Sequence, residues 1–328
     1  MRTRLGFLLA LTIVSRAAAQ TNLVWPPPPD EPRVRYVQSI SQPADLGSKR
    51  SGFRRFSNWL TGARQGNETL NRPFGLALDD SDDLCVTDTG ANAVSYFDHK
   101  ARRWYRWEQI GQIRFVSPVA IAKKGKTIFV ADSGLAAVIA FNLEGKLLFQ
   151  IKEGIERPSG LAIAGDRLLV ADSQQHCITI FDLHGKRLTK FGKRGGGPGE
   201  FNYPTHIASG PNNRVLVTDS MNSRVQVFDA NGNFQRQIGG VGDGPGHFSR
   251  PKGVAVDRSG RIYVVDALFD NVQVFDADGR LLMDFGHGGS QPGEFWLPNG
   301  IAIGSSNRIY VADSYNHRVQ VFNYVGPQ

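Results

Sequence analysis

Six aspartates recur along the chain, each at the end of a short apolar run. Carboxylates gathered into a ring could bind a metal ion or exchange protons with a substrate. A reactive site, however, must be built where the copies of a repeat differ, so we expect the repeated aspartates to be structural. Their predicted role is to organise the loop that follows them by accepting backbone N–H groups, and some are expected to pair with Arg224 and Arg318. The six are Asp88, Asp132, Asp172, Asp219, Asp266 and Asp313, at spacings of 44, 40, 47, 47 and 47 residues.

Three histidines from different repeats could in principle gather a metal ion. His206 stands where four other copies have glycine, and His176 and His317 precede the position that holds arginine in two copies. His317 belongs to an Asn-His-Arg pattern of the repeat, so we expect it to pack or cap a loop. No nucleophile with a plausible base stands out. The sequence therefore predicts no cofactor, with a zinc or calcium site as the alternative.

The elements that position these residues follow from an internal repeat. A motif of the type Arg-Pro-x-Gly-apolar-Ala begins at Arg72, Arg157 and Arg250, returns at Leu297, and has looser copies at Pro118 and Pro204. Within one repeat, four β-branched and aromatic runs alternate with tight Asp/Gly turns. These runs cover residues 252–256, 261–265, 271–275 and 280–285.

Four strands in 40 to 47 residues is the size of a propeller blade. Six such units predict an all-β fold, a six-bladed β-propeller of four-stranded antiparallel blades over residues 72–328. The sixth repeat lacks a fourth strand before the chain reaches Gln328. We expect the β-prone segment 33–41 to supply it and to close the ring, which removes an open sheet edge.

The segment Asp313 to Phe322 resembles the NHL repeat, as do residues 219–228 and the linkers 191–201 and 285–295. The resemblance extends over 72–328. It implies a propeller that usually binds something, since only some relatives are enzymes. Relatives with zinc- or calcium-dependent lyase or lactonase activity carry acidic and histidine ligands in the channel, and those motifs have no residue-by-residue match here. We therefore expect a non-catalytic binding or scaffold module, with a metal-dependent hydrolase or lyase at the channel mouth as the alternative.

A partner surface is expected on one rim of the propeller. In such blades the loop between strands two and three and the linker to the next blade lie on the same face. Departures from the repeat there, including an apolar Leu-Phe pair in the fifth repeat, mark a surface that suits a protein partner. Packing of the aromatic side chains between blades is the alternative. The candidate rim residues are His206, Lys252, Leu268, Phe269, Trp296 and Asn299, with Tyr203 nearby.

The N-terminal region adds three expectations. Residues 1–19 have the basic start, apolar run and small-residue end of a signal peptide, so we expect an exported protein, periplasmic or secreted. Residues 20–71 form a Pro-rich linker, the closing strand and a basic amphipathic helix at 48–65. That helix either lies across a propeller face or contacts a membrane surface or acidic partner.

Charge and cysteine content restrict the function further. The formal net charge is +8, but much of it lies in residues 1–19 and 48–65, so the repeats lack the basic face that a nucleic-acid binder needs. We expect a monomer. The two cysteines, Cys85 and Cys177, fall two blades apart and are expected to be unpaired thiols. Cys177 also replaces the arginine of repeats four and six, which removes an ion pair there.

Overall fold

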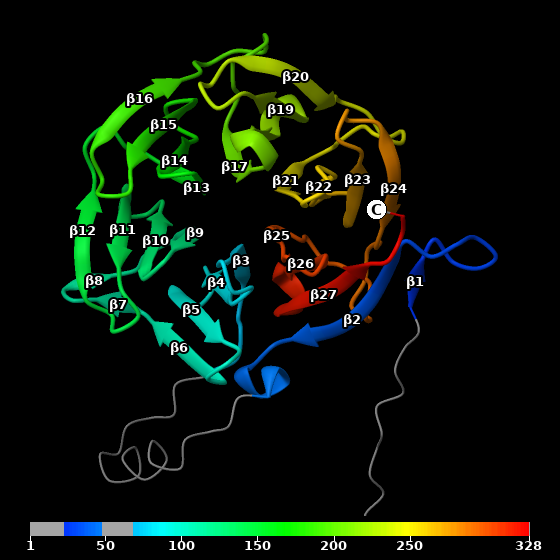
Figure 1. The fold of residues 1–328 in the computed structure, drawn as a ribbon, viewed down its shortest axis with the longest axis horizontal. Coiled ribbons are helices and arrows are strands. Elements are labelled where there is room, and N and C mark those ends of the chain that lie inside the picture. Colours follow the sequence, from blue (N-terminus) through cyan, green and yellow to red (C-terminus); the bar gives the residue numbers. More distant parts are fainter. Residues whose placement is uncertain (1–22, 48–67, 328) are drawn as a thin grey trace, which may run out of the picture.

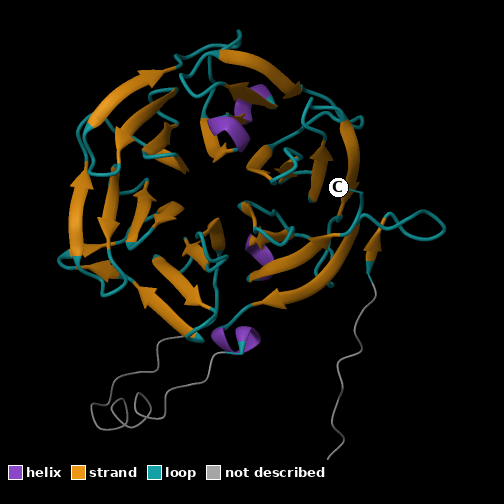
Figure 2. Cartoon of the chain, viewed as in Figure 1, coloured by secondary structure: helices purple, strands orange, loops and turns teal. Residues whose placement is uncertain are grey.

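The computed structural model describes residues 23–47 and 68–327. In this part of the chain, six antiparallel sheets stand around a central axis as the blades of a propeller (Figure 1). The only helices among the described residues are four short 3-10 turns (Figure 2). The predicted signal peptide at 1–19 and amphipathic helix at 48–65 lie outside the described residues.

Each of the first five blades has four strands in chain order from the axis outward. Blades one and two contain β3 (Pro73–Leu78), β4 (Leu84–Asp88), β5 (Ala93–Asp98) and β6 (Arg103–Trp107), then β9 (Pro118–Lys124), β10 (Thr127–Asp132), β11 (Ala137–Phe141) and β12 (Leu147–Ile151). Blade three contains β13 (Pro158–Ala164), β14 (Arg167–Asp172), β15 (Cys177–Asp182) and β16 (Arg187–Phe191). Blades four and five contain β17 (Pro204–Ser209), β18 (Val215–Asp219), β19 (Arg224–Phe228) and β20 (Phe234–Gly239), then β21 (Pro251–Val256), β22 (Ile262–Asp266), β23 (Asn271–Phe275) and β24 (Leu281–Phe285).

Blade six joins the two ends of the described chain. Its inner strands β25 (Ile301–Ile303), β26 (Arg308–Asp313) and β27 (Arg318–Tyr324) are followed outward by β2 (Val34–Ile40) and then β1 (Val24–Trp25). Strand β2 pairs antiparallel with β27, from Val34 opposite Tyr324 to Ile40 opposite Val319. The predicted closure of the ring by residues 33–41 is therefore confirmed. The fifth strand, β1, was not predicted.

Phenylalanines from the linkers anchor the blades to one another. Phe201, Phe248 and Phe295 are fully buried, and each follows a fourth strand that ends at or just before a glycine, namely Gly192, Gly239 or Gly286. A Cβ at Gly239 would lie 2.3 Å from the ring of Phe248, and the φ of this glycine is +78°. Both constraints require glycine there. The repeated linker motif is thus a packing device that fixes the path of the chain between blades.

Neither cysteine forms a disulfide. Cys85 on β4 and Cys177 on β15 are buried and unpaired, as predicted. Burial raises the pKa of the Cys177 thiol, which keeps it in its unreactive protonated form. Among the described residues, the structure has no helix of the length and apolarity needed to cross a membrane.

Candidate binding face and central cluster

The loops between strands two and three and the linkers between blades share one face of the propeller, which we call the linker face. The repeated aspartates tie these two kinds of segment together. Asp132 accepts N–H groups from Val116 and Ser117 in the linker and from Gly134 and Leu135 in the loop, at 2.8 to 3.1 Å. The sequence predicted the loop contacts and missed those to the linker.

The other copies follow the same plan with small variations. Asp172 accepts the N–H of Glu156 at 2.7 Å and those of the loop residues Gln174 and Gln175 at 3.0 Å. Asp313 accepts the N–H of Trp296 at 2.8 Å. All six carboxylates are buried. Each aspartate thus acts as a clamp that holds its part of the linker face in a fixed conformation.

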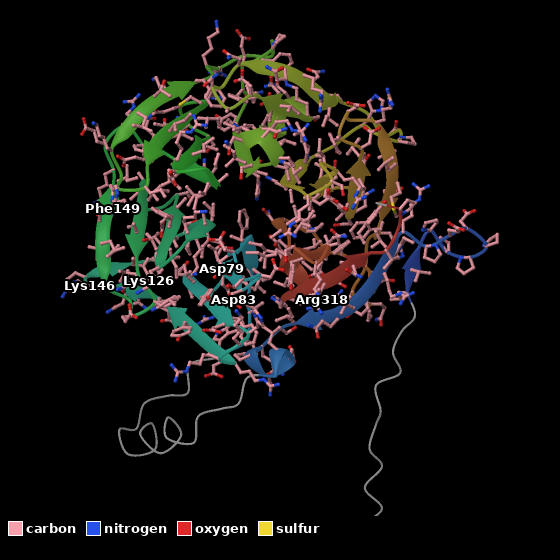
Figure 3. The ribbon with its side chains drawn as sticks, viewed as in Figure 1. Asp79, Asp83, Lys126, Lys146, Phe149 and Arg318 are labelled. Carbon is pink, nitrogen blue, oxygen red and sulfur yellow. The ribbon has the colours of Figure 1, made fainter. Side chains whose placement is uncertain are left out.

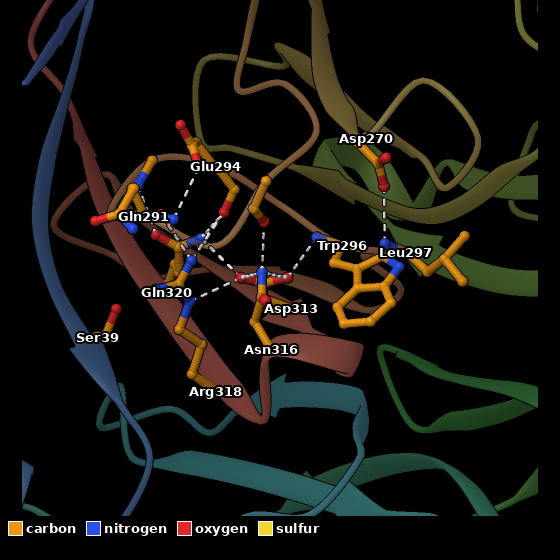
Figure 4. Close-up of polar contacts among 12 residues, drawn as sticks. Ser39, Asp270, Gln291, Glu294, Trp296, Leu297, Asp313, Asn316, Arg318 and Gln320 are labelled. Carbon is orange, nitrogen blue, oxygen red and sulfur yellow. Dashed lines mark hydrogen bonds and ion pairs between the residues drawn. The ribbon is translucent and has the colours of Figure 1, made fainter.

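Blades four and six extend the clamp with an arginine and a glutamine, and Figure 4 shows the arrangement in blade six. Arg318 Nε donates to Asp313 at 2.7 Å, while its Nη2 donates to the carbonyls of Gln291 and Glu294. Gln320 Nε2 donates to the same Glu294 carbonyl at 2.6 Å. In blade four, Arg224 makes the matching ion pair with Asp219 at 2.8 Å. The predicted pairing of both arginines is therefore observed.

The fixed linker face carries a set of exposed apolar side chains. Trp296 and Tyr315 contact each other with ring centroids 5.6 Å apart, and the guanidinium of Arg72 lies over the Tyr315 ring at 5.0 Å. Leu268 is 52% exposed. Seven of the large apolar side chains that are exposed in the described residues belong to this face: Val116, Tyr203, Met221, Val241, Leu268, Trp296 and Tyr315.

Phe269 differs from its neighbour Leu268. It is only partly exposed and lines a shallow open recess of about 270 Å³ together with Val241, Asp243 and Phe248. Val241 at its edge is 81% exposed. The two members of the predicted Leu-Phe pair therefore have different surroundings, since the leucine faces solvent and the phenylalanine forms the wall of a recess. Val241 and Met221 were missed, although both occupy the loops and linkers that the repeat assigns to this face.

A second group of predicted residues meets at the axis, where the innermost strands begin. His206 on β17 stacks on Phe74 of β3, with ring centroids 6.2 Å apart and an interplanar angle of 23°. Blades four and one stand on opposite sides of the ring (Figure 1). The two aromatic side chains therefore meet across the axis and narrow it near the linker face.

Close approach of the inner strands explains why glycine is usual at the His206 position. A Cβ at Gly253 would lie 2.5 Å from the carbonyl oxygen of Asn299 in the next blade, and one at Gly300 would lie 2.2 Å from that of Phe74. The glycine N–H groups donate to these same carbonyls at 2.9 Å. His206 interrupts this pattern, and it brings a titratable ring to the axis.

The polar groups around His206 are poorly satisfied. Both ring nitrogens are buried without a hydrogen-bond partner, and so is Oδ1 of Asn299, a residue only 8% exposed. Burial, with a smaller effect of the Lys252 charge, lowers the pKa of His206 to about 3. The nearby Asn299 amide raises this pKa slightly, although it does not complete a hydrogen bond of good geometry with the ring. Burial and Arg250 lower the pKa of Lys252 to about 8.

The predicted candidates thus divide between two places on one face. His206, Lys252 and Asn299 form the central cluster, with Phe74 as a member that the sequence did not reveal. Leu268, Phe269 and Trp296 lie farther out among the loops and linkers. Phe74 carried no signal in the sequence because it sits at a variable position of the repeat and its partner belongs to the opposite blade.

The three histidines considered as metal ligands have separate surroundings. His176 Nδ1 accepts a hydrogen bond from the backbone N–H of Tyr203 at 3.2 Å, and the imidazole packs edge-on against the Tyr203 ring. His317 Nδ1 contacts the carbonyl oxygen of Asn71. Across residues 23–47 and 68–327, no three His, Cys, Asp or Glu side chains are grouped so that they could hold a metal ion.

A different polar network joins blades one and two on the opposite face, and Figure 3 labels its members Asp79 and Asp83. Tyr96 Oη donates to Asp83 at 2.8 Å and contacts Asp79 at 3.1 Å. Lys123 Nζ donates to Asp79 at 2.7 Å, and His99 pairs with Asp83. Every member has a partner. This network therefore joins two blades and offers no unpaired group to a ligand.

Comparison with known proteins agrees with this architecture. The chain matches a family model described as a 6-bladed beta-propeller over residues 152–213 and 209–267, and the model of the NHL repeat over residues 295–322. No curated protein matches the chain.

Several solved structures share the fold. A streptogramin B lyase is 12% identical with a TM-score of 0.57, covering 77% of this chain and 94% of its own. The hydrazine synthase of Kuenenia stuttgartiensis is 14% identical with a TM-score of 0.57, covering 80% and 98%. A protein of unknown function from Bacteroides thetaiotaomicron is 13% identical with a TM-score of 0.61, covering 89% and 75%. At such identities the likeness concerns the fold alone.

Proposed function

Since the chain is a six-bladed β-propeller that carries NHL repeats, we propose that it is a non-catalytic scaffold that holds a protein partner on its linker face. The observation that carries the proposal is the gathering of exposed Trp, Tyr, Met, Leu and Val side chains on that face. Large exposed apolar groups cost solvation free energy, and when they are gathered on one face they commonly mark an interaction site. Aromatic residues, Met and Arg are also the types enriched at protein interfaces.

The rigid support beneath these side chains favours the same function. Trp296 donates its backbone N–H to the buried Asp313, and Leu268 donates its own to Asp266 at 3.0 Å. Side chains held on such a frame lose little conformational entropy when a partner binds. The remaining exposed apolar residues of the described chain are scattered, mostly on the outermost strands, as with Leu188 on β16 and Leu282 on β24.

The proposal includes export from the cytoplasm, based on the signal-peptide pattern of residues 1–19. The partner would then be an exported or surface protein. The alternative of a metal-dependent hydrolase or lyase at the channel mouth has no grouped ligands to support it in the described residues.

Site-specific photo-crosslinking tests the proposed surface. A photoreactive amino acid placed at Leu268 on the linker face is expected to give a discrete adduct with a partner in the native compartment. The matched control position is Leu188, which is 49% exposed against 52% for Leu268 but lies on an outermost strand. Equal adducts at both positions, or an adduct at Leu188 only, would overturn the assignment of the linker face.

An alanine substitution measures the energetic role of the face once the adduct is identified. Trp296→Ala removes the largest exposed aromatic side chain there and is expected to weaken partner binding by about 2 kcal/mol, roughly thirtyfold. Leu282→Ala on β24 is the control and is expected to have no effect. Unchanged affinity in Trp296→Ala would remove that residue from the interface.

A further inference from the structure

The central cluster presents hydrogen-bonding groups that the protein itself does not satisfy. Neither nitrogen of His206 has a partner, and Asn299 Oδ1 is buried without one. Lys252 makes no hydrogen bond or ion pair with the described residues. Buried polar groups are normally paired because each unpaired group costs free energy. Lys252 and Asn299 both lie close enough to His206 to act on its ring, so one ligand could contact all three side chains.

The positive charge of the cluster determines the sign of the charge that a ligand must carry. Lys252 supplies a positive charge, Arg250 on the adjoining linker adds a second, and no carboxylate is among the groups that act on Lys252 or His206. His206 is neutral at pH 7, so at this pH one ring nitrogen is a donor and the other an acceptor. A partly buried ammonium without a counter-ion favours an anion.

The acceptor in the cluster narrows the ligand further. Asn299 Oδ1 lies near the His206 ring without completing a hydrogen bond to it, so a donor on the ligand would satisfy this oxygen, and a simple anion has none. A carboxylate with a hydroxyl or N–H group on the adjacent atom supplies both, since its oxygens would accept from Lys252 and His206. The Phe74 ring, stacked on His206 at 6.2 Å, offers an apolar wall and fixes the imidazole plane.

We propose that the central cluster of Phe74, His206, Lys252 and Asn299 is a binding site for a carboxylate that carries a neighbouring hydrogen-bond donor. Two sources have this chemistry, namely a small hydroxy acid and the C-terminal residue of a peptide, whose amide N–H lies next to its carboxylate. The site is separate from the outer apolar surface and does not depend on the proposed protein partner.

Calorimetric titration of the full chain tests the site with small probes. Glycolate represents the hydroxy acid, N-acetylglycine represents a chain end, and acetate lacks the donor. Acetamide lacks the charge. We expect saturable binding of at least one of the first two, weaker binding of acetate and none of acetamide. If only N-acetylglycine binds, the source is a peptide terminus. If only glycolate binds, it is a small acid.

Three substitutions assign the roles of the residues. Lys252→Met keeps the apolar stem and is expected to weaken the binding probe about tenfold or more, because a hydrogen bond to a charged group is lost. Asn299→Ala is expected to abolish the preference for glycolate or N-acetylglycine over acetate. His206→Gly restores the residue usual at this position and is expected to weaken all the acids.

The control is Lys126→Met, at an exposed lysine labelled in Figure 3. Lys126 lies on the β9–β10 hairpin, on the face opposite the linker face, and the variant is expected to bind as the unaltered chain does. Each variant is checked by its thermal unfolding, and a bound acid should also raise the melting temperature of the unaltered chain. Absence of saturable heat with all the acids at millimolar concentration, or equal binding by Lys252→Met and Lys126→Met, would overturn the proposal.

Discussion

At the scale of single residues, the clearest deviation from a stability-optimised fold is a lysine near the axis. Lys252 keeps its charge in a place where burial and Arg250 lower its pKa to about 8. A folded-state pKa below the unfolded value means that the charged form destabilises the folded protein at pH 7. A neutral side chain of similar length should therefore give a more stable fold, and the proposed carboxylate would offset the cost of the lysine when it binds.

Lys252→Met is therefore expected to raise the free energy of unfolding at pH 7 by about 1 to 3 kcal/mol, since it removes an unpaired charge. The gain should shrink between about pH 8 and 10.5, because the folded lysine releases its proton there while the unfolded chain keeps its own. His206 does not change charge in this window. Denaturant unfolding of both proteins across this range measures the difference, and a constant difference would contradict the lowered pKa.

His206 gives a second test at the residue scale. With a pKa of about 3, its imidazole stays neutral over the range of about pH 5 to 8 in which exposed histidines titrate. The chemical shifts of the His206 ring in an NMR titration are thus expected to stay constant over this range. A midpoint near 6.5 for His206 would show that the ring is solvated, and it would weaken the case for the central cluster.

At the scale of elements, the repeated aspartate is the link between a loop and a linker. Asp132 accepts four backbone N–H groups and is fully buried. Asp132→Ala leaves these donors unpaired and is expected to destabilise the protein by about 3 kcal/mol or more. The exposed Asp278 in the β23–β24 turn is the control, and Asp278→Ala should change stability by less than about 0.5 kcal/mol.

Hydrogen exchange localises the effect of that substitution. The amides of Val116, Ser117, Gly134 and Leu135 should lose protection together in Asp132→Ala, because one carboxylate holds all four. Faster exchange in the loop alone would mean that the linker is held by other contacts. That result would reduce the aspartate to the loop-organising role that the sequence already suggested.

The elements that repeat were predictable, and so was the closing strand, because blade six lacked its fourth copy, whereas the other elements that occur once were not. Strand boundaries and the closing strand followed from β-prone runs and turn residues recurring in register. Strand β1 has two residues, and the hairpin of β7 (Gln109–Ile110) and β8 (Ile113–Arg114) occurs in one linker only, so neither had a second copy for comparison. The contact of Phe74 with His206 was hidden for another reason. It joins opposite blades, and only the closed ring brings these positions together.

At the scale of the whole molecule, the proposed export predicts where the mature chain begins. The signal-peptide pattern ends in a run of alanines at 17–19, so the processed protein is expected to begin near Gln20. Intact mass and N-terminal sequencing of protein recovered from its native compartment measure the start. A mature protein that retains Met1 and residues 2–19 would contradict processing, and it would make an exported partner untenable.

The closing strand makes the ring one cooperative unit. In a propeller each blade packs on its two neighbours, so a blade without its outer strand weakens both interfaces and not only its own sheet. Strand β2 buries Val34 and Ile40 fully, and Tyr36 packs on Phe322 with ring centroids 5.7 Å apart. Strand β1 adds Trp25, which contacts Phe285 and Phe322 at 6.0 and 5.7 Å. The two strands thus differ in what their loss exposes.

Two N-terminal truncations separate these contributions. A chain starting at Arg33 loses β1 and is expected to unfold cooperatively at a lower temperature, with a loss of about 2 to 4 kcal/mol from the tryptophan packing. A chain starting at Gln42 also loses β2, which leaves β27 as an open edge. Its loss should exceed half of the roughly 5 to 15 kcal/mol that a domain has, with aggregation through the exposed edge. Calorimetry of both chains measures the step between them, and equal melting temperatures would mean that the ring is stable without closure by β2.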